Sequence, residues 1–191
     1  MTLIFIIIFF LICFVVPSVR TYKKTGLNPI VFTNTENAHD LIGFYMKIVL
    51  FLILLSGVEK DHYMNFEFPK VFENSNTTQI GMILMVISLC WIAIAQLQMA
   101  NSWRIGIDEK NKTELTATGL FLFSRNPIYV GMISAQIGFF LYHSSYLNLI
   151  ILICAYLLTS IQVRLEEEYL LRMHGNSYLD YKGKVSRWLL F

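Results

Sequence analysis

The chain has 191 residues, of which 55% are hydrophobic and 15% are charged, with a mean hydropathy of +0.55. Soluble domains contain about 25% charged residues, so this composition indicates a membrane protein. The 15 Lys and Arg residues nearly balance the 13 Asp and Glu residues, which excludes a nucleic-acid-binding protein that works by neutralising phosphates.

Five apolar stretches predict membrane-spanning helices, giving an all-α polytopic bundle. Eighteen residues at about 1.5 Å per residue reach about 27 Å, close to the roughly 30 Å of a hydrocarbon core. Such segments are helical in lipid because unpaired backbone groups are costly there. The predicted spans are 2–19, 41–58, 80–100, 126–142 and 146–163. Only His143, Ser144 and Ser145 separate the last two, which predicts a tight helical hairpin.

The basic residues predict the orientation of this bundle. Arg20, Lys23 and Lys24 follow the first span and none precedes it, which favours a retained helix with its N-terminus outside over a cleaved signal peptide. With five spans, residues 20–40, 101–125 and 164–191 share one side and carry twelve of the 15 Lys and Arg residues. The positive-inside rule makes that side cytoplasmic. The connecting segments are too short for a separate core, so we expect one membrane-embedded domain over 1–191, with three spans in 1–100.

The fourth predicted span begins at a polar corner. Asn126 suits the N-cap and Pro127 the first helical position, while Arg125 precedes both. A helix N-terminus beside an arginine favours an anion such as a carboxylate or phosphate. The alternative is that Arg125 is an interfacial anchor.

The last span is followed by three consecutive carboxylates, Glu166 to Glu168. Arg164 can pair with Glu167 or Glu168 at helical spacing, and the remaining carboxylates suit a ligand with a positive charge and hydroxyl groups. The alternative is a solvated helix end. Further on, Gly175 is placed to end the helix. Tyr129, Tyr178 and Tyr181 could face a cation, or lie at the membrane interface as ordinary aromatic residues.

The cysteines and histidines lack the spacing of a metal or disulfide site. Cys13, Cys90 and Cys154 lie in apolar runs without a C-x-x-C pair. The four histidines follow no H-x-x-x-H or H-x-x-E pattern; they are His39, His62, His143 and His174. We therefore expect no metal.

Three strings, taken together, resemble the isoprenylcysteine carboxyl methyltransferase and phospholipid methyltransferase superfamily. They are WRIGI (103–107), LTATGLFLFSRNPIYVG (115–131) and RLEEEYLLRMHGNSYLDYKGKVSRW (164–188). The resemblance implies an integral membrane enzyme that uses S-adenosylmethionine, enclosed by the hairpin and a short cytoplasmic helical C-terminal segment. Residues 101–191 would be the cofactor-binding catalytic half. Two residues depart from the family pattern: Asn126 stands where many members have His, and His174 where Phe is usual.

The resemblance also implies roles for individual residues. Arg125, Tyr129 and Glu167 would be catalytic. The cofactor-binding set would be Gly119, Arg125, Asn126, Pro127, Tyr129, Arg164, Glu166, Glu167, Tyr178 and Tyr181. Within it, Glu166 and Glu167 would bind the ammonium or hydroxyl groups of the donor, Arg125 its carboxylate, and Tyr129 or Tyr178 would face its sulfonium.

Several functions fit this pattern. The first is methylation of an isoprenylcysteine-like carboxylate or another lipophilic acceptor that enters from the bilayer. A carboxylate nucleophile needs no general base, whereas a phospholipid amine must lose a proton, for which Glu167 or a tyrosine is a candidate. Methylation of a phospholipid amine or of a small thiol is the nearest alternative function. The others are an NADPH-dependent membrane reductase and a non-enzymatic membrane subunit.

Overall fold

The computed structural model describes residues 2–30, 38–61, 66–99, 102–104 and 114–189, and every structural statement below concerns these residues. Several sequence features fall outside them. These are Ala100 at the end of the third predicted span, residues 105–107 of the WRIGI string, Lys110, Lys112 and His62.

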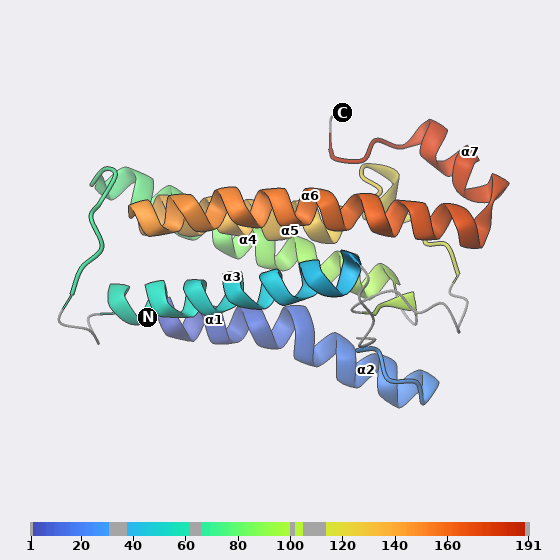
Figure 1. The fold of residues 1–191 in the computed structure, drawn as a ribbon, viewed down its shortest axis with the longest axis horizontal. Helices are drawn as coiled ribbons and strands as arrows, with labels where there is room; N and C mark the ends of the chain where they lie inside the picture. Colours follow the sequence, from blue (N-terminus) through green and yellow to red (C-terminus); the bar gives the residue numbers. More distant parts are fainter. Residues whose placement is uncertain (1, 31–37, 62–65, 100–101, 105–113, 190–191) are drawn as a thin grey trace.

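The described chain folds into long helices that run along one axis (Figure 1). The N-terminal helix comprises α1 (Thr2–Phe10), the π-helical turn η1 (Leu11–Val15) and α2 (Val16–Thr25). The following helices are α3 (Ala38–Lys60), α4 (Ser75–Met99), the short 3-10 helix η3 (Gly119–Leu122), α5 (Pro127–Tyr142), α6 (Tyr146–His174) and α7 (Asn176–Lys184). The all-helical prediction is confirmed.

Four of these helices are long and apolar enough to cross a membrane: Thr2–Thr25, Ala38–Lys60, Ser75–Met99 and Tyr146–His174. Exposed Ile, Phe and Leu side chains on their outer faces suit contact with lipid. The remaining predicted span corresponds to α5, which has 16 residues and is shorter than the other four. The count of five spans therefore stays a prediction.

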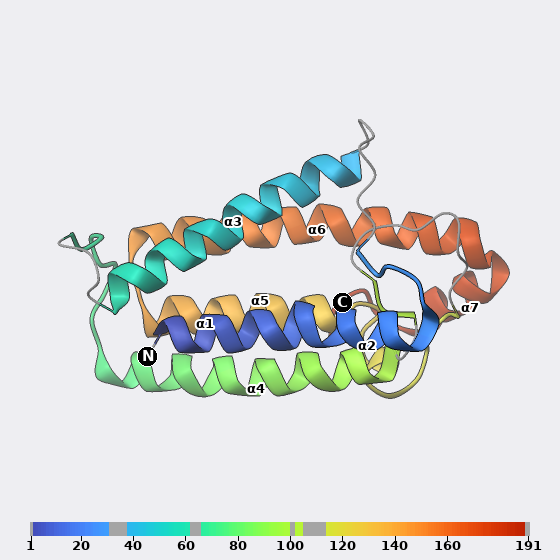
Figure 2. The ribbon, with the colours of Figure 1, turned by 90° about the horizontal axis from the view of Figure 1, so that it is seen from below.

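The long helices pack side by side in pairs that share members, and Figure 2 shows α4 alongside α5 and α3 alongside α6. Helix α5 also contacts α6, and α1 contacts α3. The contact between α4 and α5 depends on glycine, because a Cβ on Gly81 would lie 2.5 Å from the carbonyl oxygen of Gly138. The two backbones therefore touch, as small residues permit between membrane helices.

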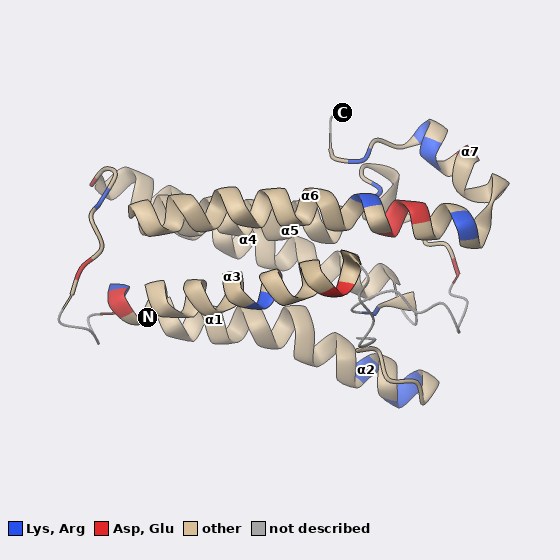
Figure 3. Cartoon of the chain, in the orientation of Figure 1, with Lys and Arg blue, Asp and Glu red and all other residues tan. Residues whose placement is uncertain are grey.

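The bundle has two chemically different ends (Figure 3). We call the end that carries residues 115–128 and 164–189 the tail end, and the end that carries residues 56–72 and 142–146 the hairpin end. Most Lys, Arg, Asp and Glu residues gather at the tail end, beside α2, the end of α6 and α7. At the hairpin end, residues 143–145 join α5 to α6.

Candidate functional site

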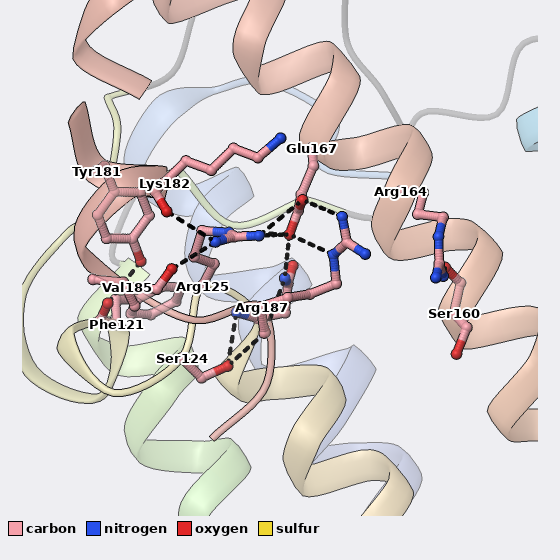
Figure 4. A network of polar contacts seen from close by, with 11 residues as sticks. Phe121, Ser124, Arg125, Ser160, Arg164, Glu167, Tyr181, Lys182, Val185 and Arg187 are labelled. Atoms are coloured by element: carbon pink, nitrogen blue, oxygen red, sulfur yellow. Dashed lines mark hydrogen bonds and ion pairs between the residues drawn. The ribbon is translucent and has the colours of Figure 1, made fainter. Parts of the chain in front are cut away.

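Motif residues from the α5 corner meet motif residues from the end of α6 at the tail end of the bundle (Figure 4). Glu167, only 4% exposed, is the centre of the contact. Its Oε1 accepts hydrogen bonds from Arg125 Nε at 3.1 Å, Asn126 Nδ2 at 3.1 Å and Arg187 Nε at 3.2 Å. Its Oε2 accepts from the terminal nitrogens of Arg125 at 3.2 Å and Arg187 at 3.0 Å. We call these four residues the clasp.

Arg125 joins the clasp to the chain that follows α7. Its Nη1 donates to the carbonyl oxygens of Lys182 at 3.2 Å and Val185 at 2.5 Å. Its backbone N–H donates to the carbonyl oxygen of Ser186 at 2.9 Å. With its side chain 8% exposed, the guanidinium is buried among acceptors from two segments. It therefore holds the tail against the start of α5.

Further hydrogen bonds fix the same junction. Ser124 Oγ and Asn126 Nδ2 both donate to the carbonyl oxygen of Arg187, at 3.0 and 3.3 Å. Tyr181 Oη donates to the carbonyl oxygen of Phe121 at 2.7 Å. Asn126 is the N-cap residue of α5 as predicted, but its side chain does not cap the helix. Its Nδ2 donates to Glu167 Oε1 instead, and a hydrogen bond to an ionised carboxylate is stronger than one between neutral groups.

A second polar cluster begins one helical turn further along α5. Tyr129 Oη donates to Glu166 Oε1 at 2.5 Å, and Gln162 Nε2 donates to the same oxygen at 2.8 Å. Gln162 Nε2 also lies 2.7 Å from His39 Nε2 at the start of α3. Consecutive carboxylates therefore enter different clusters, since neighbouring helical residues point in different directions. Glu168 remains exposed.

The tyrosines of α7 pack inward rather than facing solvent. The rings of Tyr178 and Tyr181 meet edge to face at 6.2 Å between centroids, against Leu115, Ala117 and Leu170. Burial raises the pKa of Tyr181 to about 12 and raises the pKa of Tyr178 as well. Both phenols are therefore neutral at physiological pH.

The remaining predicted site residues lie around these clusters. Pro127 is buried at the start of α5, and its carbonyl oxygen accepts from Trp91 Nε1 at 2.9 Å. Gly119 has φ +63° and lies against the side chain of Gln98, where a Cβ would clash. The sequence predicted that Arg164 pairs with Glu167 or Glu168. In the described structure Arg164 Nη1 donates instead to the carbonyl oxygen of Ser160, at 2.6 Å. Glu167 is turned toward the interior, where two other arginines meet it.

The tail forms a polar cavity of about 460 Å³ beside the clasp. It is lined by Arg125, by residues 182–187 and by Trp188. The basic side chains outnumber the single carboxylate of Glu167, so the electrostatic potential there favours an anionic group.

Sequence reasoning did not predict the contacts of three polar residues in these two clusters, Arg187, Gln162 and His39. Arg187 lies in the third motif string, 164–188, and received no partner, while His39 was weighed only as a metal ligand. Gln162 is a polar residue among the apolar residues of the last predicted span. A polar residue within a predicted span is itself a signal, because it must find a partner inside the bundle. Gln162 meets that criterion.

Two comparisons bear on this site. The sequence profile of a family described as phospholipid methyltransferase matches residues 76–177. The chain is also 31% identical over 150 residues to the protein-S-isoprenylcysteine O-methyltransferase of Saccharomyces cerevisiae, a match that covers 74% of this chain and 61% of the yeast protein. The chain thus spans about six tenths of the length of that relative.

Proposed function

The chain belongs to the phospholipid methyltransferase family, and from this premise we propose that it is an integral membrane methyltransferase that uses S-adenosylmethionine. The observation that carries the proposal is the meeting of Arg125 at the α5 corner, Glu167 of α6 and the tail, beside one polar cavity at the end of an apolar bundle. We further propose that this tail end faces the cytoplasm, because most basic residues lie there.

The residues around the cavity suit the donor. A volume of about 460 Å³ falls within the range of small-molecule sites, roughly 300–1,000 Å³. Lys182 and Arg187 can bind its carboxylate, and Trp188 offers a flat apolar face to its base. When bound, S-adenosylmethionine supplies an electrophilic methyl group whose C–S electron pair leaves with sulfur.

Within this function, we assign Arg125 and Glu167 a positioning role. Arg125 already donates to Glu167 and to two tail carbonyl groups, so it acts by holding the wall of the cavity. Glu167 balances part of the positive charge of Arg125 and Arg187. Fixing the wall in advance lowers the entropic cost of bringing donor and acceptor together.

We assign Tyr129 and Glu166 to the acceptor. Apolar acceptor chains can enter from the bilayer, while the polar donor enters from the tail end. A carboxylate acceptor, as in the isoprenylcysteine of the yeast relative, attacks without losing a proton. An ammonium acceptor must first lose one, and we assign the role of base to Glu166, which Tyr129 and Gln162 hold in place. The second acceptor class, a phospholipid amine, is favoured by this cluster.

The proposal is tested by titrating the full chain in detergent with S-adenosylmethionine and, separately, with NADPH. A ligand present at about a hundred times its Kd adds about 2.7 kcal/mol to the free energy of unfolding. We expect stabilisation by S-adenosylmethionine, and transfer of its labelled methyl group to a lipid extract. Stabilisation by NADPH alone would identify a reductase instead, and stabilisation by neither would favour a non-enzymatic subunit.

A further inference from the structure

A second cavity, of about 260 Å³, lies between α1, α3 and α5. Its walls are Phe, Ile, Leu, Met and Ala side chains, with Gln136 as the single polar lining residue. Phe10 and Leu54 line it and are also exposed on the outside of the bundle, so the cavity reaches the surface that faces lipid. Its volume of about 260 Å³ suits one hydrocarbon chain rather than a whole lipid.

Gln136 is the unusual feature of this cavity. The residue is 8% exposed, and its Nε2 meets no acceptor in the part of the chain that the structure describes. A buried amide without an acceptor loses its hydrogen bonds to water and gains nothing in return. A pure hydrocarbon in the cavity would leave this donor unpaired, whereas a chain that carries a carbonyl oxygen would pair it.

The position of Gln136 along α5 sets where that carbonyl group must lie. Gln136 follows Tyr129 by seven residues, which is about 10 Å along an α-helix. Met132, one turn after Tyr129, lines the cavity between them. In an extended glycerophospholipid, a comparable length separates the headgroup amine from the ester carbonyl. An isoprenyl chain has no carbonyl group at this depth.

The N-terminal helix departs from α-helical geometry where it lines this cavity. The π-helical turn η1 begins at Leu11, which lines the cavity. Gln96 Nε2 of α4 donates to the carbonyl oxygen of Cys13 at 2.7 Å, which satisfies a backbone group within this turn. Such π-helical turns are frequent at functional sites. The first two long helices thereby shape a cavity beside the catalytic half of the chain.

We propose that this cavity binds one acyl chain of a glycerophospholipid whose ester carbonyl oxygen accepts a hydrogen bond from Gln136 Nε2. The inference rests on the proposed methyltransferase function and selects its acceptor: the headgroup amine of the same lipid then lies near Tyr129 and Glu166. Gln136 is the residue that distinguishes an acyl ester from an isoprenyl chain.

The test compares two lipids with the same headgroup and chain length, diacyl phosphatidylethanolamine and its dialkyl ether analogue, which lacks the carbonyl groups. Binding to the full chain is measured in detergent without a methyl donor, by thermal stabilisation across a lipid titration. We expect the diacyl lipid to bind about tenfold more tightly, as one added hydrogen bond implies. Equal affinities, or tighter binding of N-acetyl-S-farnesylcysteine, would overturn the proposal.

A variant pair localises the effect. Gln136→Leu keeps the approximate side-chain volume and removes the donor, so we expect it to bind both lipids equally. Met132→Leu changes the same wall without removing a donor, and the tenfold preference should persist. A preference that survives Gln136→Leu would overturn the assignment. If Gln136→Leu fails to fold, the comparison of the two lipids on the unaltered chain still decides.

The readout separates this inference from the proposed function. A diacyl preference without any methyl transfer would leave the acyl site standing and refute the methyltransferase. Methyl transfer from S-adenosylmethionine with equal affinity for the two lipids would refute the acyl site alone.

Discussion

The two ends of the bundle are closed in different ways. At the tail end, Glu167 holds two arginines from separate segments beside an open polar cavity. At the hairpin end, His143 Nδ1 lies 3.2 Å from Ser56 Oγ and its Nε2 lies 3.0 Å from Glu59 Oε2. Both clusters are buried. The comparison teaches that buried charge alone does not identify a functional site, and the proposed site at the tail end rests on the adjoining polar cavity as well.

We call His143, Ser56 and Glu59 the hairpin cluster, and its surroundings support this distinction. His143 is 2% exposed, and the 66–72 segment covers it through hydrogen bonds such as Val71 N–H to the carbonyl oxygen of Ser144 at 2.6 Å. Phe68 N–H donates to Glu59 Oε1 at 3.2 Å. The sequence interpretation gave His143 no role, and the structure gives it a structural one.

The largest expected effect comes from the clasp. Glu167→Gln leaves the buried Arg125 and the partly exposed Arg187 with only a neutral partner, and we expect the free energy of unfolding to fall by about 3 kcal/mol. The backbone N–H of Arg125, which donates to the carbonyl oxygen of Ser186, should exchange faster with deuterium. Chemical unfolding and hydrogen exchange measure the two effects.

The matched control is Glu168→Gln, one residue along the same helix and exposed. Its stability should stay within about 0.5 kcal/mol of the original chain. Equal losses in the two variants would show that the clasp contributes no more than a surface charge.

The hairpin cluster should instead make the free energy of unfolding depend on pH. Burial and the positive charges of Lys60 and Lys70 lower the pKa of His143 to about 4, and Glu59 and Ser56 face the same ring. Between pH 6.5 and 4 the unfolded chain therefore binds a proton that the folded chain does not. Stability is full above about pH 6.5 and falls with acidification, by about 2 kcal/mol at pH 5.

Unfolding measured at pH 7 and pH 5 checks this prediction. The variant His143→Gln should lose the pH dependence that the imidazole supplies. If the free energy of unfolding of this variant still falls as much between pH 7 and pH 5, the effect belongs to other groups.

A comparable effect is expected where α4 and α5 touch. In Gly81→Ala, the new Cβ would meet the carbonyl oxygen of Gly138 and the backbone nitrogen of Tyr142 at 2.5 Å, so the helices must separate. We expect a loss of about 2 kcal/mol in unfolding experiments. Gly183→Ala is the control, because a Cβ there meets no atom within 4 Å. Similar losses in both would contradict the close backbone contact.

The smallest effect concerns the junction of α7 with η3. Tyr181→Phe removes the hydrogen bond to the carbonyl oxygen of Phe121 and should cost about 1 kcal/mol of stability. Tyr156→Phe, on an exposed position of α6, should change nothing measurable. The prediction fails if thermal unfolding does not separate the two variants.

The sequence predicted the helical segments well because hydropathy is a property of consecutive residues. Helices α3 and α4 contain most of the predicted spans 41–58 and 80–100, and α5 ends at Tyr142 as expected. The same reasoning could not find the π-helical turn at Leu11–Val15, since its backbone is stabilised by Gln96 of another helix. The cofactor role of the motif residues remains a prediction.

By itself, the sequence determined that this protein is a bundle of apolar helices and that its C-terminal half carries the family motifs. Only the tertiary structure decided which charges pair: Glu167 meets Arg125 and Arg187 rather than Arg164 on its own helix. It also left Gln136 facing a cavity, where its Nε2 meets no acceptor among the residues that the structure describes. The physical reason is that hydropathy acts locally along the chain, whereas a buried polar group is satisfied only by whatever distant segment the fold brings to it.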